Sequence, residues 1–255
     1  MKKTILITGA TSGFGKAIAE KFASEKHDLI ITGRRSNLLK ALQQELQTTY
    51  GIIVTTLNFD IRDKEAVKAA VATLKEQPID ILVNNAGLAA GLATIDEGAL
   101  DDWDCMIDTN LKGLLYITKS VIPLLKKSTC PHIFNIGSTA AKMSYKNGNV
   151  YCATKHAVDA LSQAMRIDLL PFSIKVTAIH PGMAETEFSL VRFKGDATKA
   201  KQVYEDIMPL QAADIAHIVS YSAALPAHVC INDLTVTCTN QANAVYTLRN
   251  KELQK

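Results

Sequence analysis

The segment Lys3-Thr-Ile-Leu-Ile-Thr-Gly-Ala-Thr-Ser-Gly-Phe-Gly15 indicates the fold of this 255-residue chain. Its first part is a short apolar run rich in β-forming residues, which predicts a buried strand. Three glycines follow, and apolar side chains then recur at helical spacing as far as Phe22. A strand, a glycine-rich turn and a helix in this order are typical of a dinucleotide-binding site.

Each of the three glycines has a physical reason in such a site. Gly9 permits the tight turn after the strand, and Gly13 lets the backbone approach a pyrophosphate. Gly15 permits the helix to pack closely on the strand. Because the N-terminus of that helix offers unpaired N–H groups to phosphates, this loop is the predicted cradle of the cofactor.

Strands and helices alternate along the rest of the chain, without a linker or an internal repeat. Mostly apolar runs predict further buried strands at 28–33, 52–59, 79–84, 132–137, 174–179 and 234–238. Helical spacing predicts helices at 36–50, 63–77, 99–127, 150–170 and 211–225, and a weaker one near 197–208. This order predicts one α/β domain over residues 1–255, a doubly wound parallel (Rossmann) sheet of about seven strands with ligands at their carboxyl ends.

Composition agrees with one large globular domain, since 47% of the residues are hydrophobic and 21% are charged. A net charge of +3 is too small and too scattered to indicate a nucleic-acid partner. The five cysteines are odd in number and show no metal-binding spacing, so we expect reduced thiols in a cytoplasmic protein and no metal. No apolar run is long enough for a signal peptide or a membrane span.

Tyr151, Lys155 and Ser138 form the predicted catalytic set. Tyr151 and Lys155 are four residues apart and share one face of a predicted helix, which places the ammonium beside the phenol. A nearby positive charge lowers the pKa of a tyrosine, so we expect Tyr151 to act as a general acid and base near neutral pH. Ser138 supplies a hydroxyl at the end of the strand predicted at 132–137.

The end of the second predicted strand indicates which dinucleotide binds. It reads Thr32-Gly-Arg-Arg35, with no carboxylate at positions 33–36 to accept hydrogen bonds from the ribose of NAD. Arg34 and Arg35 are suited instead to the 2′-phosphate of NADP. Other motifs, Asn84-Asn-Ala-Gly87 and Pro181-Gly182, end the strands that begin at 79 and 174 and converge on the same sheet edge.

Taken in order, these motifs resemble those of the short-chain dehydrogenase/reductase family over nearly the whole chain. They are Thr8-Gly-Ala-Thr-Ser-Gly-Phe-Gly15, Asn84-Asn-Ala-Gly87, Asn110, Ser138, Tyr151 with Lys155, and Pro181-Gly182. Within the family the chain is especially similar to the bacterial NADP-dependent 3-hydroxy acid dehydrogenases, also described as serine or L-allo-threonine dehydrogenases. Met106-Ile-Asp-Thr-Asn110, Thr186-Glu-Phe-Ser189 and Val191-Arg-Phe-Lys-Gly-Asp196 carry part of that narrower likeness.

The resemblance implies a role for each matching residue. Tyr151 moves the proton, Ser138 hydrogen-bonds the substrate oxygen, Lys155 lowers the tyrosine pKa and holds the nicotinamide ribose, and Asn110 supports a water-linked proton path. The expected NADP-binding residues are Gly9, Thr11, Ser12, Gly13, Phe14, Gly15, Arg34, Arg35, Asp60, Ile61, Asn85, Ala86, Gly87, Tyr151, Lys155, Pro181, Gly182 and Thr186.

The predicted activity is interconversion of a small 3-hydroxy acid, such as serine, allo-threonine or 3-hydroxypropionate, and its 3-oxo acid or semialdehyde. A substrate carboxylate in a closed cleft requires a cationic or hydrogen-bonding partner. Lys142, Lys146, Arg192 and Lys194 are the candidates, and Arg192 and Lys146 are the expected substrate residues alongside Ser138 and Tyr151. Residues 183–209 are expected to close over the cleft as a lid.

Two other activities remain open at this stage. One is a broad-specificity NADPH-dependent carbonyl reductase, and the other is a non-catalytic NADPH-binding regulatory module. The family resemblance also implies a homotetramer, formed through the helices at 99–127 and 150–170. His180, directly before Pro181, is expected to have a structural role.

Overall fold

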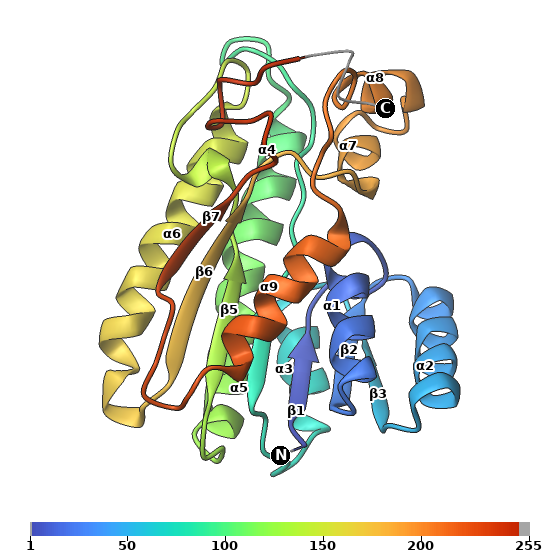
Figure 1. Cartoon of the computed structure of the whole chain (residues 1–255), viewed down its shortest axis with the longest axis vertical. Helices are drawn as coiled ribbons and strands as arrows, with labels where there is room; N and C mark the ends of the chain where they lie inside the picture. Colours follow the sequence, from blue (N-terminus) through green and yellow to red (C-terminus); the bar gives the residue numbers. More distant parts are fainter. Residues whose placement is uncertain (1, 250–255) are drawn as a thin grey trace.

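Seven strands form one parallel sheet in the computed structural model, which describes residues 2–249 (Figure 1). The strands are β1 (Thr4–Ile7), β2 (Asp28–Gly33), β3 (Val54–Asn58), β4 (Ile81–Asn84), β5 (His132–Ile136), β6 (Lys175–Pro181) and β7 (Asp233–Val236). Their order across the sheet is β3-β2-β1-β4-β5-β6-β7. The chain therefore reverses its winding direction between β1 and β4, and this confirms the predicted doubly wound fold.

Helices cover both faces of the sheet. On one face lie α1 (Gly13–Ser24), α2 (Ser36–Tyr50) and α9 (Ala212–Ala224), whose buried side chains form one core cluster with the strands. On the other face lie α3 (Lys64–Ala72), α5 (Leu114–Leu125) and α6 (Asn149–Asp168), which bury a second cluster. The inner strands lie between the two layers with both faces buried, which explains why they read as apolar runs, whereas the edge strands β3 and β7 are partly exposed.

The helix predicted at 99–127 is divided in the structure. It consists of α4 (Leu100–Ile107), a π-helical segment, η1 (Asp108–Gly113), and α5. Within η1 the Asn110 side chain bonds the backbone of Leu88, which lies in the loop after β4. An inserted π turn is common at functional sites and does not change the apolar period of the flanking helices, so the sequence pattern did not reveal it.

The segment predicted as a lid contains two short helices, α7 (Glu187–Arg192) and α8 (Ala197–Gln202). The Thr186 side chain caps α7 by accepting a hydrogen bond from the Phe188 N–H group, at 3.2 Å. The weak helix predicted near 197–208 is shorter than expected, and α7 was not predicted. In Figure 1 both helices lie beyond the carboxyl ends of β1 and β2.

The remaining elements are two short 3₁₀ helices, η2 (Thr139–Ala141) after β5 and η3 (Leu170–Phe172) after α6. Across residues 2–249, no helix combines the length and the apolar character that a membrane crossing requires.

Candidate active site

A cavity of about 560 Å³ opens at the carboxyl ends of the strands. With the exception of Gly15, every residue that the sequence predicted to contact NADP lines this cavity. Ser138 and Arg192 line it as well, whereas Asn110 and Lys146 do not. The structure therefore brings the glycine loop, the arginines after β2 and the Ser-Tyr-Lys set into one space, as the topology of the sheet predicts.

The glycine loop has the geometry that a bound pyrophosphate needs. Gly9 adopts a φ of 66°, a left-handed backbone conformation that residues with a side chain rarely adopt. A Cβ atom on Gly15 would lie 2.3 Å from the Gly9 carbonyl oxygen and 2.5 Å from the Asn85 side-chain nitrogen. Gly15 thus lets α1 approach the loop, which leaves the N–H groups at the start of α1 facing the cavity.

Asn85 joins the glycine loop to the end of β4. Its side-chain amide donates to the carbonyl oxygens of Thr8, at 2.9 Å, and Gly9, at 3.1 Å. The Thr8 hydroxyl in turn accepts hydrogen bonds from the backbone N–H groups of Asn85 and Ala86, each at 3.0 Å. Sequence reasoning did not assign a role to Thr8, whose fully buried hydroxyl holds the glycine loop against the end of β4.

Arg34 and Arg35 lie at the cavity wall where the sequence placed the 2′-phosphate. Arg35 donates to the hydroxyls of Thr11 and Ser12, each at 2.9 Å from Nη2, and pairs with Glu187 of α7 at 3.1 Å. Arg34 lies 3.7 Å from Asp60 and is more than half exposed. The fork of each guanidinium is suited to a phosphate, so the donor groups present fit NADP.

Asp60 is held in its charged form at this wall. The Arg62 guanidinium donates to its carboxylate at 2.7 Å and holds the pKa of Asp60 below its ordinary value. Asp60 and Ile61 both line the cavity next to Arg34. Arg62 satisfies the Asp60 carboxylate, which leaves the more exposed Arg34 available to a ligand phosphate.

Tyr151 and Lys155 are buried side by side on α6, and Ser138 begins η2 opposite them. Burial raises the pKa of Tyr151 above its ordinary value, while hydrogen bonding from Ser138 and the charge of Arg192 act in the opposite direction. The Lys155 ammonium lies 5.9 Å from the centroid of the Tyr151 ring and donates to the Ile136 carbonyl oxygen at 2.9 Å. Burial lowers the pKa of Lys155 to about 8.

The expected lowering of the Tyr151 pKa by Lys155 together with the charge of a bound cofactor ring stays a prediction, because without the cofactor the pKa of Tyr151 is raised. Burial disfavours the phenolate more than the surrounding charges favour it. The hydrogen bond that the Lys155 ammonium makes goes to the end of β5 and not to the Tyr151 hydroxyl. Tyr151 is protonated at neutral pH, which is the form that donates a proton to a carbonyl oxygen.

Asn110 lies behind the cavity wall. Its side chain exchanges two hydrogen bonds with the Leu88 backbone, both at 2.8 Å, and donates to the Thr154 hydroxyl at 3.1 Å. A Cβ atom on Gly87 would lie 3.2 Å from the Asn110 side-chain oxygen and 3.6 Å from the Lys155 ammonium. Asn110 thus ties the loop after β4 to α6, and its place in a proton path stays a prediction.

Of the four cations considered as carboxylate partners, Arg192 lines the cavity and the other three do not. Lys142 pairs with Asp159 and Asp233, and Lys194 pairs with Asp102 at 2.9 Å. Lys146 is exposed. The structure therefore does not place Lys146, Lys142 or Lys194 at the cavity, where the sequence expected a carboxylate partner.

Arg192 extends from α7 over two tyrosine rings. Its guanidinium carbon lies 5.4 Å from the centroid of Tyr145 and 5.7 Å from that of Tyr151. The Arg192 Nε atom is buried and has no hydrogen-bond partner among the described residues. Phe188 packs on Tyr151 with ring centroids 5.6 Å apart, so α7 places both an aromatic ring and a cation next to Tyr151. Sequence reasoning missed Tyr145, for which the only signal was an aromatic residue between Ser138 and Tyr151.

Comparison with known proteins agrees with this geometry. A family model described as short chain dehydrogenase matches residues 3–196. The chain belongs to the short-chain dehydrogenase family. This confirms the predicted family and the predicted dehydrogenase class.

Individual relatives cover almost the whole chain. The NADP-dependent 3-hydroxy acid dehydrogenase YdfG of Salmonella typhi is 46% identical over 243 residues, which are 94% of this chain and 96% of the relative. Sulfoacetaldehyde reductase 2 of Chromohalobacter salexigens is 44% identical over 245 residues, 95% of this chain and 96% of the relative. The closed form of serine dehydrogenase complexed with NADP⁺ is 43% identical, with a TM-score of 0.89 over 94% of this chain and 97% of that chain.

Proposed function

We propose that this protein is an NADP-dependent oxidoreductase that interconverts a small 3-hydroxy acid and its 3-oxo acid or semialdehyde. The observation that carries the substrate class is Arg192, whose unpartnered Nε atom and planar fork lie over the Tyr151 ring. A guanidinium in this position can pair with a substrate carboxylate while the neighbouring carbon reacts at Tyr151. Relatives named for 3-hydroxy acids, serine and sulfoacetaldehyde agree, since each of these compounds carries an acidic group near the reacting carbon.

The residues of this chain would hold the cofactor and the substrate and move the proton. When bound, NADPH supplies a hydride to the substrate carbon. The glycine loop and the start of α1 would hold the pyrophosphate, and Arg34 and Arg35 the 2′-phosphate. Ser138 hydrogen-bonds the substrate oxygen, which Tyr151 protonates during reduction and deprotonates during oxidation.

Burial of the catalytic pair favours its uncharged forms. The raised pKa of Tyr151 keeps a proton available for reduction of a carbonyl at neutral pH. The lowered pKa of Lys155, about 8, allows this lysine to change its charge within the working range of many enzymes. Oxidation of a hydroxy acid requires the phenolate, so it is expected to gain more from alkaline pH than reduction does.

Substitution of Arg192 tests the substrate class. Arg192→Met should raise KM for serine or 3-hydroxypropionate by about tenfold or more, since the carboxylate loses its partner, while an uncharged aldehyde is barely affected. Lys146→Met is the matched control, because Lys146 is exposed and lies outside the cavity. If Arg192→Met affects charged and uncharged substrates alike, the broad-specificity carbonyl reductase becomes the better assignment. If NADPH binds stoichiometrically and no carbonyl is reduced, the protein is a binding module.

The assembly and location of the protein are also proposals. We propose a cytoplasmic homotetramer, in which α5 and α6 meet their counterparts in other subunits. Exposed apolar side chains on and just after these helices, Leu115, Ile167 and Leu170, support this assignment, and the five cysteines are free, as a reducing compartment favours. Light scattering at micromolar concentration should show about four times the 27.7 kDa chain mass. A 27.7 kDa species would exclude the tetramer.

A further inference from the structure

Four charged or titratable side chains form a cluster behind Ser138. Asp159 comes from α6, His180 from β6, Asp233 from the start of β7, and Lys142 directly follows η2. None of these four residues lines the cavity. They therefore touch neither the predicted cofactor site nor the predicted substrate site.

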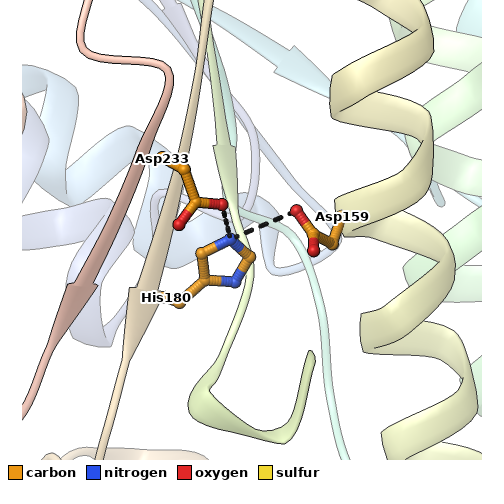
Figure 2. Close-up of side chains that lie close together, drawn as sticks. All are labelled: Asp159, His180 and Asp233. Carbon is orange, nitrogen blue, oxygen red and sulfur yellow. Dashed lines mark hydrogen bonds and ion pairs between the residues drawn. The ribbon is translucent and has the colours of Figure 1, made fainter. Parts of the chain in front are cut away.

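His180 is fully buried at the centre of this cluster. Figure 2 shows its Nε2 atom between two carboxylates, 3.1 Å from Asp233 and 3.6 Å from Asp159. Because Nε2 faces these acceptors, it carries the proton and donates it to Asp233. Burial lowers the pKa of His180, so the ring is neutral at pH 7 and has a single donor with which to orient itself.

The opposite edge of the His180 ring lies against Gly137. A Cβ atom on Gly137 would lie 2.3 Å from Nδ1 and 2.7 Å from Cε1, so the ring occupies the space next to the glycine backbone. The Gly137 N–H group donates to the Ile179 carbonyl oxygen at 2.7 Å. The position of the ring thus limits where Gly137, and the Ser138 that follows it, can lie.

Lys142 holds the other end of the same segment. Its ammonium donates to Asp159 at 2.9 Å and to Asp233 at 2.7 Å. Between Gly137 and Lys142, the Ser138 hydroxyl accepts a hydrogen bond from the Ala140 N–H group at 3.1 Å and so begins η2. Both sides of Ser138 are therefore attached to one cluster.

Asp159 connects this cluster to the other catalytic residues. It lies on α6 four residues after Lys155 and eight after Tyr151, which are on the same face of the helix. The ligand atoms of Asp159, His180 and Asp233 are near enough to one another to hold a metal ion. However, the Lys142 ammonium already lies between the two carboxylates, so the chain supplies its own cation at this place.

We infer that Lys142, Asp159, His180 and Asp233 are positioning residues that hold the Ser138 hydroxyl at the correct place relative to Tyr151. Two contacts determine the position of Ser138 relative to Tyr151. One is the His180 ring against Gly137, and the other is the bridge from Lys142 to Asp159 on the helix that carries Tyr151. The inference rests on Ser138 and Tyr151 acting in the reaction. It does not rest on the substrate being a hydroxy acid.

Substitution of His180 tests this role. His180→Leu removes the donor but keeps an apolar side chain of similar bulk, and it should lower kcat by about tenfold, because proton transfer depends on the alignment of Ser138 and Tyr151. KM and the NADPH dissociation constant should stay within about twofold of wild type. His180→Gln keeps an N–H donor and should recover most of the lost kcat. Hydrogen exchange of the backbone at residues 137–142 should become faster in His180→Leu but not in His180→Gln.

His156→Leu is the matched control, since His156 lies on α6 beside Lys155 but is exposed and outside the cluster. Its kcat should equal that of the wild type. If His180→Leu lowers the melting temperature without lowering kcat, or if it weakens NADPH binding as much as it lowers kcat, the positioning role is wrong. The same holds if His180→Gln folds and recovers nothing.

Asp233→Asn decides the matter if His180→Leu does not fold. Asp233 is more than a third exposed, so the loss of its charge is tolerated more readily. Its kcat should fall by about threefold or more, equally for charged and uncharged carbonyl substrates, because Ser138 contacts the oxygen common to both. An unchanged kcat would overturn the inference. Since Arg192→Met tests the substrate class separately, failure of one proposal leaves the other standing.

Discussion

The two ends of the cavity are built in different ways. At the end formed by β1 and β2, most of the contacts come from a short segment, the glycine loop, whose backbone faces the cavity. At the end formed by β5, β6 and α7, side chains such as Ser138, Tyr151 and Arg192 arrive from separate elements. The cofactor end can therefore be predicted from local motifs, while the substrate end depends on which side chains the tertiary structure turns inward.

Tyr151→Phe should have the largest effect, and it acts at the substrate end alone. The substitution removes the hydroxyl that is proposed to move the proton, so kcat should fall by about 10²-fold or more. NADPH binding, measured by fluorescence titration, should persist, since the cofactor end is unchanged. Retention of more than about a tenth of the wild-type kcat would remove Tyr151 from the proton-transfer role.

Replacement of Arg34 and Arg35 is the corresponding test of the cofactor end. Charge-assisted pairs to a 2′-phosphate contribute about 1.5 to 3 kcal/mol each. With both arginines replaced by uncharged residues, the preference for NADP over NAD should fall by at least about 10²-fold in kcat/KM. The ratio of kcat/KM for the two cofactors is measured with the hydroxy or carbonyl substrate at a saturating concentration. An unchanged ratio would contradict the assignment of these arginines.

Lys155→Met tests the lowered pKa of Lys155, which lies where the two ends of the cavity meet. The pKa of Lys155 falls from 10.5 to about 8 on folding, so between these pH values the unfolded chain holds a proton that the folded chain has released. Wild-type stability should therefore rise with pH across this window, relative to Lys155→Met, by at most about 3 kcal/mol. Urea denaturation without added cofactor, at pH 7.5 and at a value near 10, measures the difference. Parallel stability curves for the two proteins would show that Lys155 is charged throughout.

Glu187→Gln should have the smallest effect, and it probes the contact between the two ends. Glu187 of α7 pairs with Arg35 at 3.1 Å, and both side chains are about half exposed. A surface pair of this kind contributes about 0.2 to 1 kcal/mol, so the released Arg35 should bind NADPH only about two- to threefold more tightly. Weaker NADPH binding would mean that Glu187 orients Arg35 instead of competing for it.

The parts of the site that could be predicted are those with a local physical cause. Gly9 needs a left-handed backbone and Gly15 needs space for α1, so the motif that contains them specifies a loop, a helix and a ligand together. The doubly wound parallel sheet follows from the alternation of strands and helices along the chain. For the same reason, Arg34 and Arg35 could be placed at the cavity wall from their position after β2.

The parts that could not be predicted depend on distant contacts. Helical spacing places Lys155 beside Tyr151, but it does not show that the Lys155 ammonium donates a hydrogen bond to the carbonyl oxygen of Ile136 on β5. Lys142 was one of the four candidate carboxylate partners in the sequence, and only the folded chain shows that two aspartates from α6 and β7 bind it. The π-helical segment that carries Asn110 left the apolar pattern unchanged, so its presence could not be read from that pattern.

The preference of the wild-type enzyme for acids over matched alcohols tests the central claim most directly. NADP⁺ reduction is followed with serine and ethanolamine, and with 3-hydroxypropionate and ethanol, two pairs that differ only by the carboxylate. Because Arg192 is expected to pair with that carboxylate, kcat/KM should be at least about tenfold higher for the acid in each pair, equivalent to about 1.4 kcal/mol. Equal or higher values for the alcohols would contradict the account and favour a carbonyl reductase without an anion requirement.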